Sequence, residues 1–170
     1  MNEKPWEKMP KIEGGVVIDH VPINRGPLVY LVLLPWLKEG VTANIRTNIP
    51  SKKIGNGENY GKKWVFKIEK LIDDEKFIEN LALVGGKELT LNYIENYEVV
   101  KKYHPELPKV VKEGILRCNN PYCVTTQDHH AGQRSEFILE NEDPLIYKCK
   151  FCGEEIDQEK IDELVLEKGF

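Results

Sequence analysis

The sequence predicts an α+β fold built in two parts. In the first hundred of its 170 residues, short segments of alternating apolar residues are interspersed with two segments of helical spacing. A stretch with two prolines at 103–109 then interrupts regular structure. Beyond it, a turn-rich segment holds all four cysteines of the chain in two close pairs. We therefore expect two domains, at 1–103 and 104–170.

The N-terminal part begins with an apolar strand, "VVIDHV", at 16–21. A helix should follow, capped by Asn24 and running to about Lys38, with Pro35 ending or kinking it. The apolar run in this helix falls well short of the roughly 18 residues of a membrane span. We therefore expect no membrane partner.

The rest of this part alternates between strand and helix patterns. Strands are expected at 41–49 and 62–70, an aspartate-capped helix at 73–84, and strands at 88–94 and 97–102. The order is β-α-β-β-α-β with one added strand, the ferredoxin-like split β-α-β pattern. Two helices would then cover one face of an antiparallel sheet. The other face would be free for an interface or a ligand.

The four cysteines follow the spacing C-x4-C-x25-C-x2-C, at Cys118, Cys123, Cys149 and Cys152. Two close pairs separated by a short excursion allow four thiolates to converge as a tetrahedron, the geometry of structural zinc. Disulfides are the alternative, which a reducing compartment disfavours. Four sulfur ligands leave no open coordination position. We therefore expect one structural Zn²⁺ in a small zinc-ribbon-like (rubredoxin-like) β domain.

Two further features lie near the cysteines. His129 and His130 are alternative metal ligands, but a shell filled by four cysteines favours a place in a loop. From Glu154 to the end, the chain carries seven acidic residues against two lysines. The apolar residues of this tail fit one face of a terminal helix; they are Ile161, Leu164 and Val165.

The charge of the chain bears on its partners. The net charge is −4 and the pI is near 5.7, whereas a protein that binds DNA or RNA usually has a basic stripe or a basic domain. We therefore expect no DNA or RNA partner, which disfavours a zinc-ribbon nucleic-acid-binding protein. The opening "MNEKPWEKMPK" lacks the apolar core of a signal peptide. The expected location is the cytoplasm.

Polar residues gather at the end of the first strand, where Asp19 and His20 are adjacent. A small hydrolase could use Asp19 to orient His20 as a general base. On a regular strand, however, neighbouring side chains point to opposite faces, so these two could share a site only at a twisted or frayed end. The alternative is a polar strand terminus beside Pro22. Because we find no paired carboxylates and no nucleophile with a partner base, we do not expect an enzyme.

Lysines occur at comparable places in the other strands. Lys63 and Lys67 share one strand face, and Asn92 and Lys102 lie on the last two strands. Together with an aspartate and a histidine, such a set could hold phosphates and a ribose. The alternative is a solvated sheet edge protected by lysines.

A glycine-rich segment, "GNGENYG" at 55–61, also invites comparison with phosphate-binding loops. Its spacing is G-x-G-x-x-x-G and a strand follows it, so it does not match their fingerprint. We expect a flexible hairpin loop.

Several segments together match a known family. "GGVVIDHVP", "FKIEK", "LTLNYIENYEVV" and the four cysteines, in this order and spacing, resemble the regulatory chain of aspartate carbamoyltransferase. The resemblance implies a non-catalytic subunit in pyrimidine biosynthesis. An N-terminal allosteric domain would bind ATP, CTP or UTP, and a zinc domain would dock on the catalytic chain. Regulatory dimers, joined through their N-terminal domains, would bridge two catalytic trimers.

The resemblance also implies an effector site, carried over motif by motif. Asp19 and Lys67 resemble the family's ribose and base contacts, and His20 and Lys102 resemble its triphosphate ligands. The remaining matches are backbone contacts to the base edge (Ile12, Tyr97), residues that line the pocket (Asn92, Ile94, Val99) and a weaker match near the phosphates (Lys63).

In the second domain, Asn120 and Lys150 match residues that face the catalytic chain in this family. The pattern also departs from the family's best-known form at three notable positions. Pro10 stands where that form has an acid, Tyr122 replaces an asparagine and Glu154 replaces a lysine. These departures affect the amino end of the pocket and the docking salt bridges.

Overall fold

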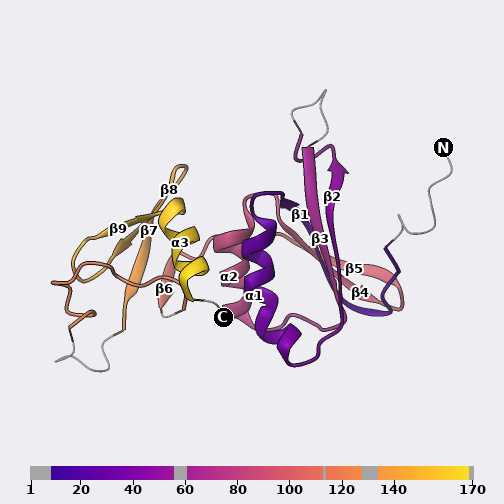
Figure 1. Ribbon diagram of the computed structural model, residues 1–170, viewed down its shortest axis with the longest axis horizontal. Coiled ribbons are helices and arrows are strands. Elements are labelled where there is room, and N and C mark those ends of the chain that lie inside the picture. Colours follow the sequence, from indigo (N-terminus) through magenta and orange to yellow (C-terminus); the bar gives the residue numbers. More distant parts are fainter. Residues whose placement is uncertain (1–8, 56–60, 113, 128–133, 169–170) are drawn as a thin grey trace.

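The computed structural model describes residues 9–55, 61–112, 114–127 and 134–168. Its first part is a five-stranded antiparallel sheet of order β2-β3-β1-β4-β5 with two helices (Figure 1). The elements are β1 (Gly14–Pro22), α1 (Gly26–Lys38), β2 (Ala43–Ser51), β3 (Gly61–Ile68), α2 (Glu75–Gly85), β4 (Thr90–Glu95) and β5 (Glu98–Tyr103). The predicted ferredoxin-like order is confirmed, with β5 as the added edge strand.

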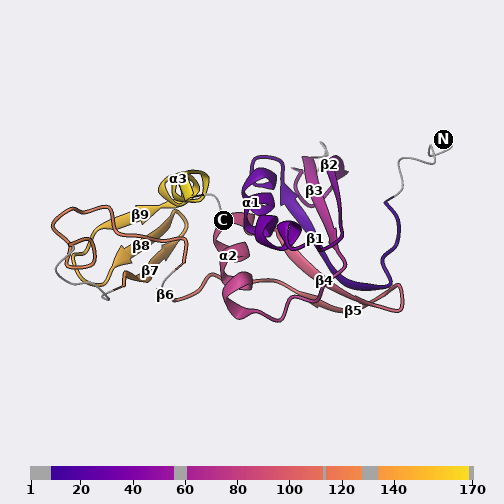
Figure 2. The same ribbon diagram turned by 60° about the horizontal axis from the view of Figure 1, so that its bottom comes forward.

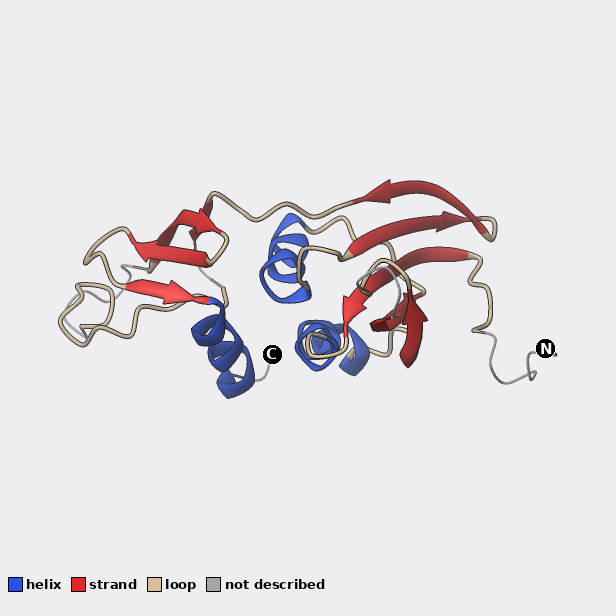
Figure 3. Ribbon diagram, turned by 90° about the horizontal axis from the view of Figure 1, so that it is seen from above, coloured by secondary structure: helices blue, strands red, loops and turns tan. Residues whose placement is uncertain are grey.

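The sheet has one buried and one open face. Ile18, Phe66 and Leu91 lie side by side on β1, β3 and β4, and each is fully buried in the core shared with α1 and α2. Both helices lie on this face, between the five-stranded sheet and the C-terminal part (Figure 3). The period-two alternation of β3 follows from this arrangement, because every second side chain faces the helices.

The start of α1 differs from the prediction, whereas its end at Lys38 does not. Arg25, not Asn24, is the N-cap residue of α1, and no side chain caps this helix. A turn positions Arg25 instead, since its N–H donates to the carbonyl of Pro22 at 2.9 Å. Pro35 does not end the helix, which continues to Lys38. The last turn is held in part by Trp36, whose ring stacks on Phe77 of α2 with ring centroids 3.9 Å apart.

The cap predicted for α2 is confirmed. The Asp74 carboxylate accepts hydrogen bonds from the backbone N–H groups of Lys76 and Phe77, at 2.9 and 3.3 Å. It thereby pairs two of the four donors that a helix N-terminus leaves free.

The second part is a small four-stranded antiparallel sheet of order β6-β7-β8-β9, joined to the first by residues 104–109 without regular secondary structure. Its elements are β6 (Val110–Lys112), β7 (Glu136–Glu142), β8 (Leu145–Cys149) and β9 (Glu155–Asp157), followed by α3 (Gln158–Lys168). The predicted terminal helix is therefore present. Its residues Ile161, Leu164 and Val165 are buried as expected.

The helix α3 lies between the two sheets, against α1 and α2 (Figures 1 and 2). The two sheets thus stand on opposite sides of a helical layer, and the open face of the five-stranded sheet is turned away from the four-stranded one (Figure 3). No helix among the described residues is long and apolar enough to cross a membrane.

Candidate functional site

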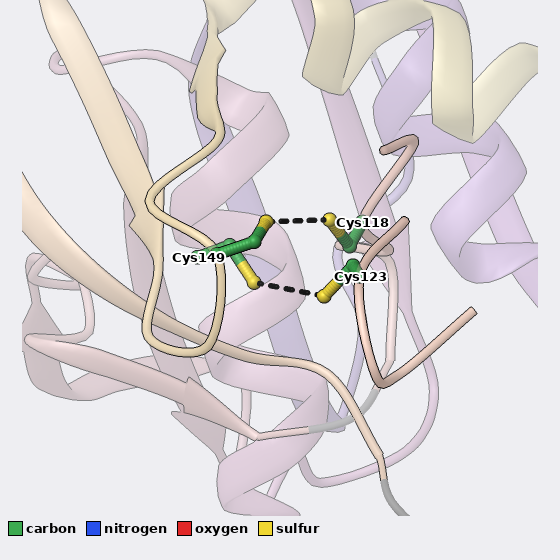
Figure 4. Close-up of side chains that lie close together, drawn as sticks. Cys118, Cys123 and Cys149 are labelled. Atoms are coloured by element: carbon green, nitrogen blue, oxygen red, sulfur yellow. Dashed lines mark hydrogen bonds between the residues drawn. The ribbon is translucent and has the colours of Figure 1, made fainter. Parts of the chain in front are cut away.

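The four cysteines converge at the far end of the small sheet. Cys118 and Cys123 belong to the loop after β6, Cys149 ends β8, and Cys152 lies in the turn before β9. The Sγ atoms of Cys118 and Cys152 are 3.4 Å apart, and those of Cys123 and Cys149 are 3.9 Å apart. Figure 4 shows the sulfur atoms of Cys118, Cys123 and Cys149 turned toward one another.

The spacing of the sulfur atoms fits one tetrahedral ion. All four Sγ atoms lie within 4.8 Å of one another. A zinc ion with Zn–S bonds of about 2.3 Å needs sulfur atoms roughly 3.8 Å apart. The cluster is therefore a metal site in its ligand set and its geometry. His129 and His130, the alternative ligands, lie outside the described residues.

Tight turns bring each cysteine pair into place. The N–H of Cys123 donates to the carbonyl of Asn120 at 3.0 Å, and the N–H of Gly153 donates to the carbonyl of Cys149 at 2.9 Å. Gly153 adopts φ 78°, a left-handed conformation that favours glycine. The local sequence therefore determines how the sulfur atoms point.

The thiols of the cluster differ in acidity. Burial raises the pKa of Cys118 and that of Cys149. Burial also opposes ionisation of Cys123, but hydrogen bonds from the hydroxyl and the backbone N–H of Thr125 outweigh it and lower the pKa of Cys123 to about 7. Cys123 therefore ionises more readily than Cys118 or Cys149, and a thiolate is the form that binds a metal.

Both residues expected to dock on the catalytic chain lie beside the cysteines and have partners within this chain. The side-chain carbonyl of Asn120 accepts from the N–H of Tyr122 at 2.9 Å, and Lys150 Nζ lies 2.9 Å from a carboxylate oxygen of Glu136. The Tyr122 side chain, by contrast, is 86% exposed. Asn120 thus shapes the loop that presents Tyr122.

At the other end of the molecule, polar residues form a row across the open face of the five-stranded sheet. Val17 of β1 is opposite both Lys67 of β3 and Asn92 of β4, and Asn92 is opposite Lys102 of β5. Directly paired residues point to the same face of a sheet. Four strands therefore bring together three of the predicted residues that are up to 35 positions apart in the sequence.

A bulge extends this row at the end of β1. The pairing of β1 with β3 shifts between Ile18 and Val21, and His20 adopts φ 57°. As a result, His20 Nδ1 lies 3.4 Å from an Asp19 carboxylate oxygen and 3.3 Å from the Thr90 hydroxyl. The twisted strand end that adjacent residues need in order to share a site is present.

Lys63 joins the same cluster. Its Nζ lies 2.6 Å from the other Asp19 carboxylate oxygen. Burial lowers the pKa of His20, an effect that Asp19 opposes and the nearby Lys63 and Lys53 reinforce. The free protein therefore keeps His20 neutral at a pH where an exposed histidine would begin to protonate.

A second bulge places the remaining β5 residue. Pairing between β4 and β5 shifts at Tyr93 and Ile94, so that Val99 is opposite Ile94 although Lys102 is opposite Asn92. The side chains of Val99 and Lys102 therefore both lie on the open face, although the two residues are three positions apart in the sequence. The Ile94 side chain is buried, whereas Val99 is half exposed.

The segment before β1 runs beside these residues. Lys67 Nζ donates to the carbonyl of Pro10 at 2.7 Å, and burial and then Lys11 lower the pKa of Lys67. Tyr97 lies in the turn between β4 and β5, and its N–H donates to the carbonyl of Glu13 at 3.1 Å. Ile12, the residue before Glu13, is buried. The segment and the turn thus frame one end of the row.

Sequence reasoning did not single out Lys53, which lies just after β2 and acts on His20 electrostatically. Its Nζ is 3.4 Å from a carboxylate oxygen of Glu88. Two adjacent lysines at the end of a strand, Lys52 and Lys53, were the feature of the sequence that could have indicated Lys53. Most of the glycine-rich loop that follows, at 56–60, lies outside the described residues, although β2 and β3 are antiparallel neighbours as a hairpin requires.

The parts of the chain that hold the two sites match two domains of one protein family. Residues 7–106 match the family model described as the aspartate carbamoyltransferase regulatory chain, allosteric domain, and residues 110–162 match that of its metal binding domain. The aspartate carbamoyltransferase regulatory chain of Sulfolobus acidocaldarius is 41% identical over 157 residues, which cover 92% of this chain and 89% of the relative. That of Pyrococcus horikoshii is 35% identical over 158 residues, which cover 92% of this chain and 97% of the relative.

The resemblance noted in the sequence is therefore confirmed along most of the chain. The relatives are named as regulatory chains, and the first family model describes an allosteric domain. The protein is thus regulatory and not catalytic. With its two matching domains and its cysteine cluster, the chain belongs to the family of aspartate carbamoyltransferase regulatory chains.

Proposed function

We propose that this chain binds a nucleoside triphosphate (ATP, CTP or UTP) on the open face of its five-stranded sheet and thereby regulates a catalytic chain in pyrimidine biosynthesis. The row formed by Lys67, Asn92 and Lys102, next to the Asp19–His20 bulge, is the observation that carries this proposal. Cations for phosphates and a carboxylate for sugar hydroxyls are here combined on one surface.

Each side chain has a role that suits its place. His20 and Lys102 would contact the triphosphate, with Lys63 close to it. Asp19 would accept from the ribose, and Lys67 would contact the ribose and base. Backbone groups of Ile12 and Tyr97 would read the base edge, while Asn92, Ile94 and Val99 would line the pocket. The hydrogen bond of Lys67 to the Pro10 carbonyl supports this division, because it holds the amino-terminal segment against the base end of the row.

Binding of a nucleotide would favour the protonated form of His20, whereas the free chain favours the neutral form. In the free chain, burial keeps its pKa low. A triphosphate beside the ring would favour the charged form, because an opposite charge within a few ångströms raises the pKa of a histidine. The Thr90 hydroxyl, 3.3 Å from Nδ1, can accept a hydrogen bond from the protonated ring.

The four cysteines would hold one structural Zn²⁺. Four thiolates satisfy the ion completely, so it would stabilise the small sheet and perform no chemistry. Zinc binding in small domains contributes roughly 10–16 kcal/mol to folding. The domain at 104–170 would then dock on the catalytic chain through Asn120 and Lys150, beside the exposed Tyr122. The domain at 1–103 would form the nucleotide site.

The proposed assembly is the one that the family resemblance implies. Regulatory dimers, joined through the N-terminal domains, would bridge catalytic trimers, and the nucleotide would act through its different affinity for two states of the complex. DNA and RNA are not proposed as partners, since the net charge is −4. We place the protein in the cytoplasm, where a reducing environment keeps four cysteines available as metal ligands.

Titration calorimetry of CTP and ATP with the free chain tests the nucleotide site. The variant Lys102→Ala should weaken binding by about tenfold or more, the usual loss for a hydrogen bond to a charged group. Lys101→Ala is the matched control, because Lys101 points to the other side and lies over the rings of Tyr93 and Tyr103. Equal losses in the two variants, or no binding to the unmodified chain, would reject the proposal.

A further inference from the structure

One ion pair connects the two parts of the chain at the end of β1. Arg25 Nη1 donates to a carboxylate oxygen of Asp162 at 2.5 Å, although the residues are 137 positions apart. Arg25 follows the turn that leaves β1, and Asp162 lies in the middle of α3. Neither side chain is well exposed, at 16% and 28%.

Gln158 ties this pair to a third element. Its side-chain amide donates to the same Asp162 oxygen at 2.9 Å and to the backbone carbonyl of Leu83 in α2 at 3.3 Å. A Cβ added at Gly86, just after α2, would lie 3.5 Å from the Pro22 side chain and 3.8 Å from that of Arg25, so the end of α2 is close to both. The end of β1, the end of α2 and the helix α3 therefore meet at one polar contact.

This contact is close along the chain to each of the two sites. Arg25 follows His20 by five positions, and the turn between them is closed by a hydrogen bond from the Arg25 N–H to the Pro22 carbonyl. On the other side, α3 follows directly on β9 of the small sheet, and β9 begins three residues after Cys152. The contact thus lies on the shortest covalent route from each site to the helical layer.

A second ion pair offers a contrast. Lys87 Nζ lies 2.7 Å from an Asp143 carboxylate oxygen, and this pair also joins the two parts of the chain. Its side chains are 67% and 82% exposed. Exposed pairs of this kind contribute little because water screens them. The pair at Arg25 is shielded and shares its acceptor with Gln158, so it can fix a geometry.

We propose that the contact between Arg25, Asp162 and Gln158 couples nucleotide binding to the metal-binding domain. In this account, which rests on the proposed nucleotide site, a ligand at Asp19 and His20 adjusts the bulge that ends β1. Arg25 transmits the adjustment to α3, and α3 moves the small sheet with it. Arg25 and Asp162 are positioning residues that touch neither the nucleotide nor the metal.

The test uses the complex of the full chain with its catalytic partner. Aspartate saturation is measured with and without CTP and ATP for the unmodified chain, Arg25→Gln, Asp162→Asn and the swapped pair Arg25→Asp with Asp162→Arg. Calorimetry on each free chain gives its nucleotide affinity. Lys87→Gln serves as the matched control.

The single variants should keep the nucleotide affinity within about twofold while the nucleotide-dependent shift in aspartate half-saturation falls at least about threefold, a loss within the usual range of allosteric coupling. The swapped pair should restore part of the shift, which a purely structural role would not require. Lys87→Gln should leave it unchanged. Unchanged shifts in Arg25→Gln and Asp162→Asn, beside a responding unmodified complex, would overturn the coupling alone.

The proposed function fails in a different way, since the unmodified chain would then bind no nucleotide. A second measurement needs no variant. Hydrogen exchange of the α3 amides at 158–168 should change when CTP binds the free chain. Unchanged exchange at 158–168 with CTP demonstrably bound would also overturn the coupling.

Discussion

The two ends of this molecule are built in opposite ways. The cysteine cluster draws its four sulfur atoms from two tight turns, and a tetrahedral ion would need all four of them. The open sheet face collects its residues from four strands, and in the proposed nucleotide site each would add a modest contribution. Loss of one member should therefore abolish the first site and only weaken the second.

Removal of one cysteine should have the largest effect. Cys118→Ala leaves three of the four proposed ligands, so most of the roughly 10–16 kcal/mol that a structural zinc ion would supply to folding should be lost. Metal content should fall to near zero, and the chain should no longer form a complex with the catalytic chain in size-exclusion chromatography. The control is Tyr122→Ser, which alters an exposed residue next to a cysteine and should keep the metal.

The same variant tests how separate the two ends are. Nucleotide binding by Cys118→Ala, measured by calorimetry, should stay within about fivefold, since no strand of the five-stranded sheet carries a cysteine and weak coupling is about 1 kcal/mol. Simultaneous loss of metal, docking and nucleotide binding would contradict the division of labour.

The converse change damages the sheet without touching the cysteines. Gly15 adopts φ 131°, and an added Cβ would lie 2.0 Å from the carbonyl oxygen of Ile68. Gly15→Ala should lower the free energy of unfolding of this part by about 2–4 kcal/mol and weaken nucleotide binding. Gly14→Ala is the control, because its Cβ would lie 3.7 Å from the nearest atom. Denaturant unfolding followed by tryptophan fluorescence provides the comparison, and equal stability of the two variants would be inconsistent with this backbone constraint.

Protonation of His20 should make nucleotide binding depend on pH. Burial lowers the pKa of His20 in the free chain, whereas a bound triphosphate would raise it, so binding should take up a proton. Affinity should therefore rise by about threefold to tenfold as the pH falls from above to below 6.5, the usual pKa of histidine. Calorimetry in buffers of different ionisation enthalpy measures the proton uptake. His20→Gln should remove the dependence, and a pH-dependent His20→Gln chain would point to another group.

The direction of the His20 pKa shift also determines how the stability of the free chain depends on pH. Because the folded pKa of His20 lies below its unfolded value, the free chain should lose stability as the pH falls through the ordinary histidine range. The bound nucleotide should offset this loss.

The smallest effect is expected at Lys53, which the sequence did not point out. Lys53→Gln removes a cation that acts on His20, and it should weaken CTP binding about twofold, as for a partly screened charge. Lys62→Gln, an exposed lysine on β3, should change it less. The difference should disappear at high salt. A tenfold loss in Lys53→Gln would show that Lys53 contacts the phosphates directly.

The cysteine cluster could be predicted from the sequence more completely than the open face, because its residues come from local turns and those of the open face from separate strands. All four metal ligands followed from local spacing, because each turn is specified within a few residues. The strands and helices of the first part followed from hydrophobic periodicity, and their ends differ from the expected positions by a few residues at most, whereas β6 to β9 were not predicted one by one. The open face needed topology, and only the family resemblance selected Asp19, Lys67 and Lys102 from other polar residues.

What the sequence could not provide depends on contacts distant along the chain. Asn24 was expected to cap α1, but the turn from Pro22 places Arg25 there and directs it toward Asp162. Periodicity also assumes regular strands, so it missed the bulge that brings the His20 side chain to Asp19 and the bulge that puts Val99 on the same face as Lys102. The ion pair and the bulge of β1 arise from packing between elements far apart in the sequence, whereas the bulge of β5 lies between consecutive strands.

Nucleotide binding on the open face would change the behaviour of a catalytic chain held by the metal-binding domain. The direct measurement is aspartate saturation of the assembled complex, of measured mass, with and without CTP and ATP. We predict that a saturating nucleotide shifts half-saturation by a factor corresponding to about 1–3 kcal/mol of coupling. Identical saturation curves with and without nucleotide, in a complex of confirmed composition, would contradict the account.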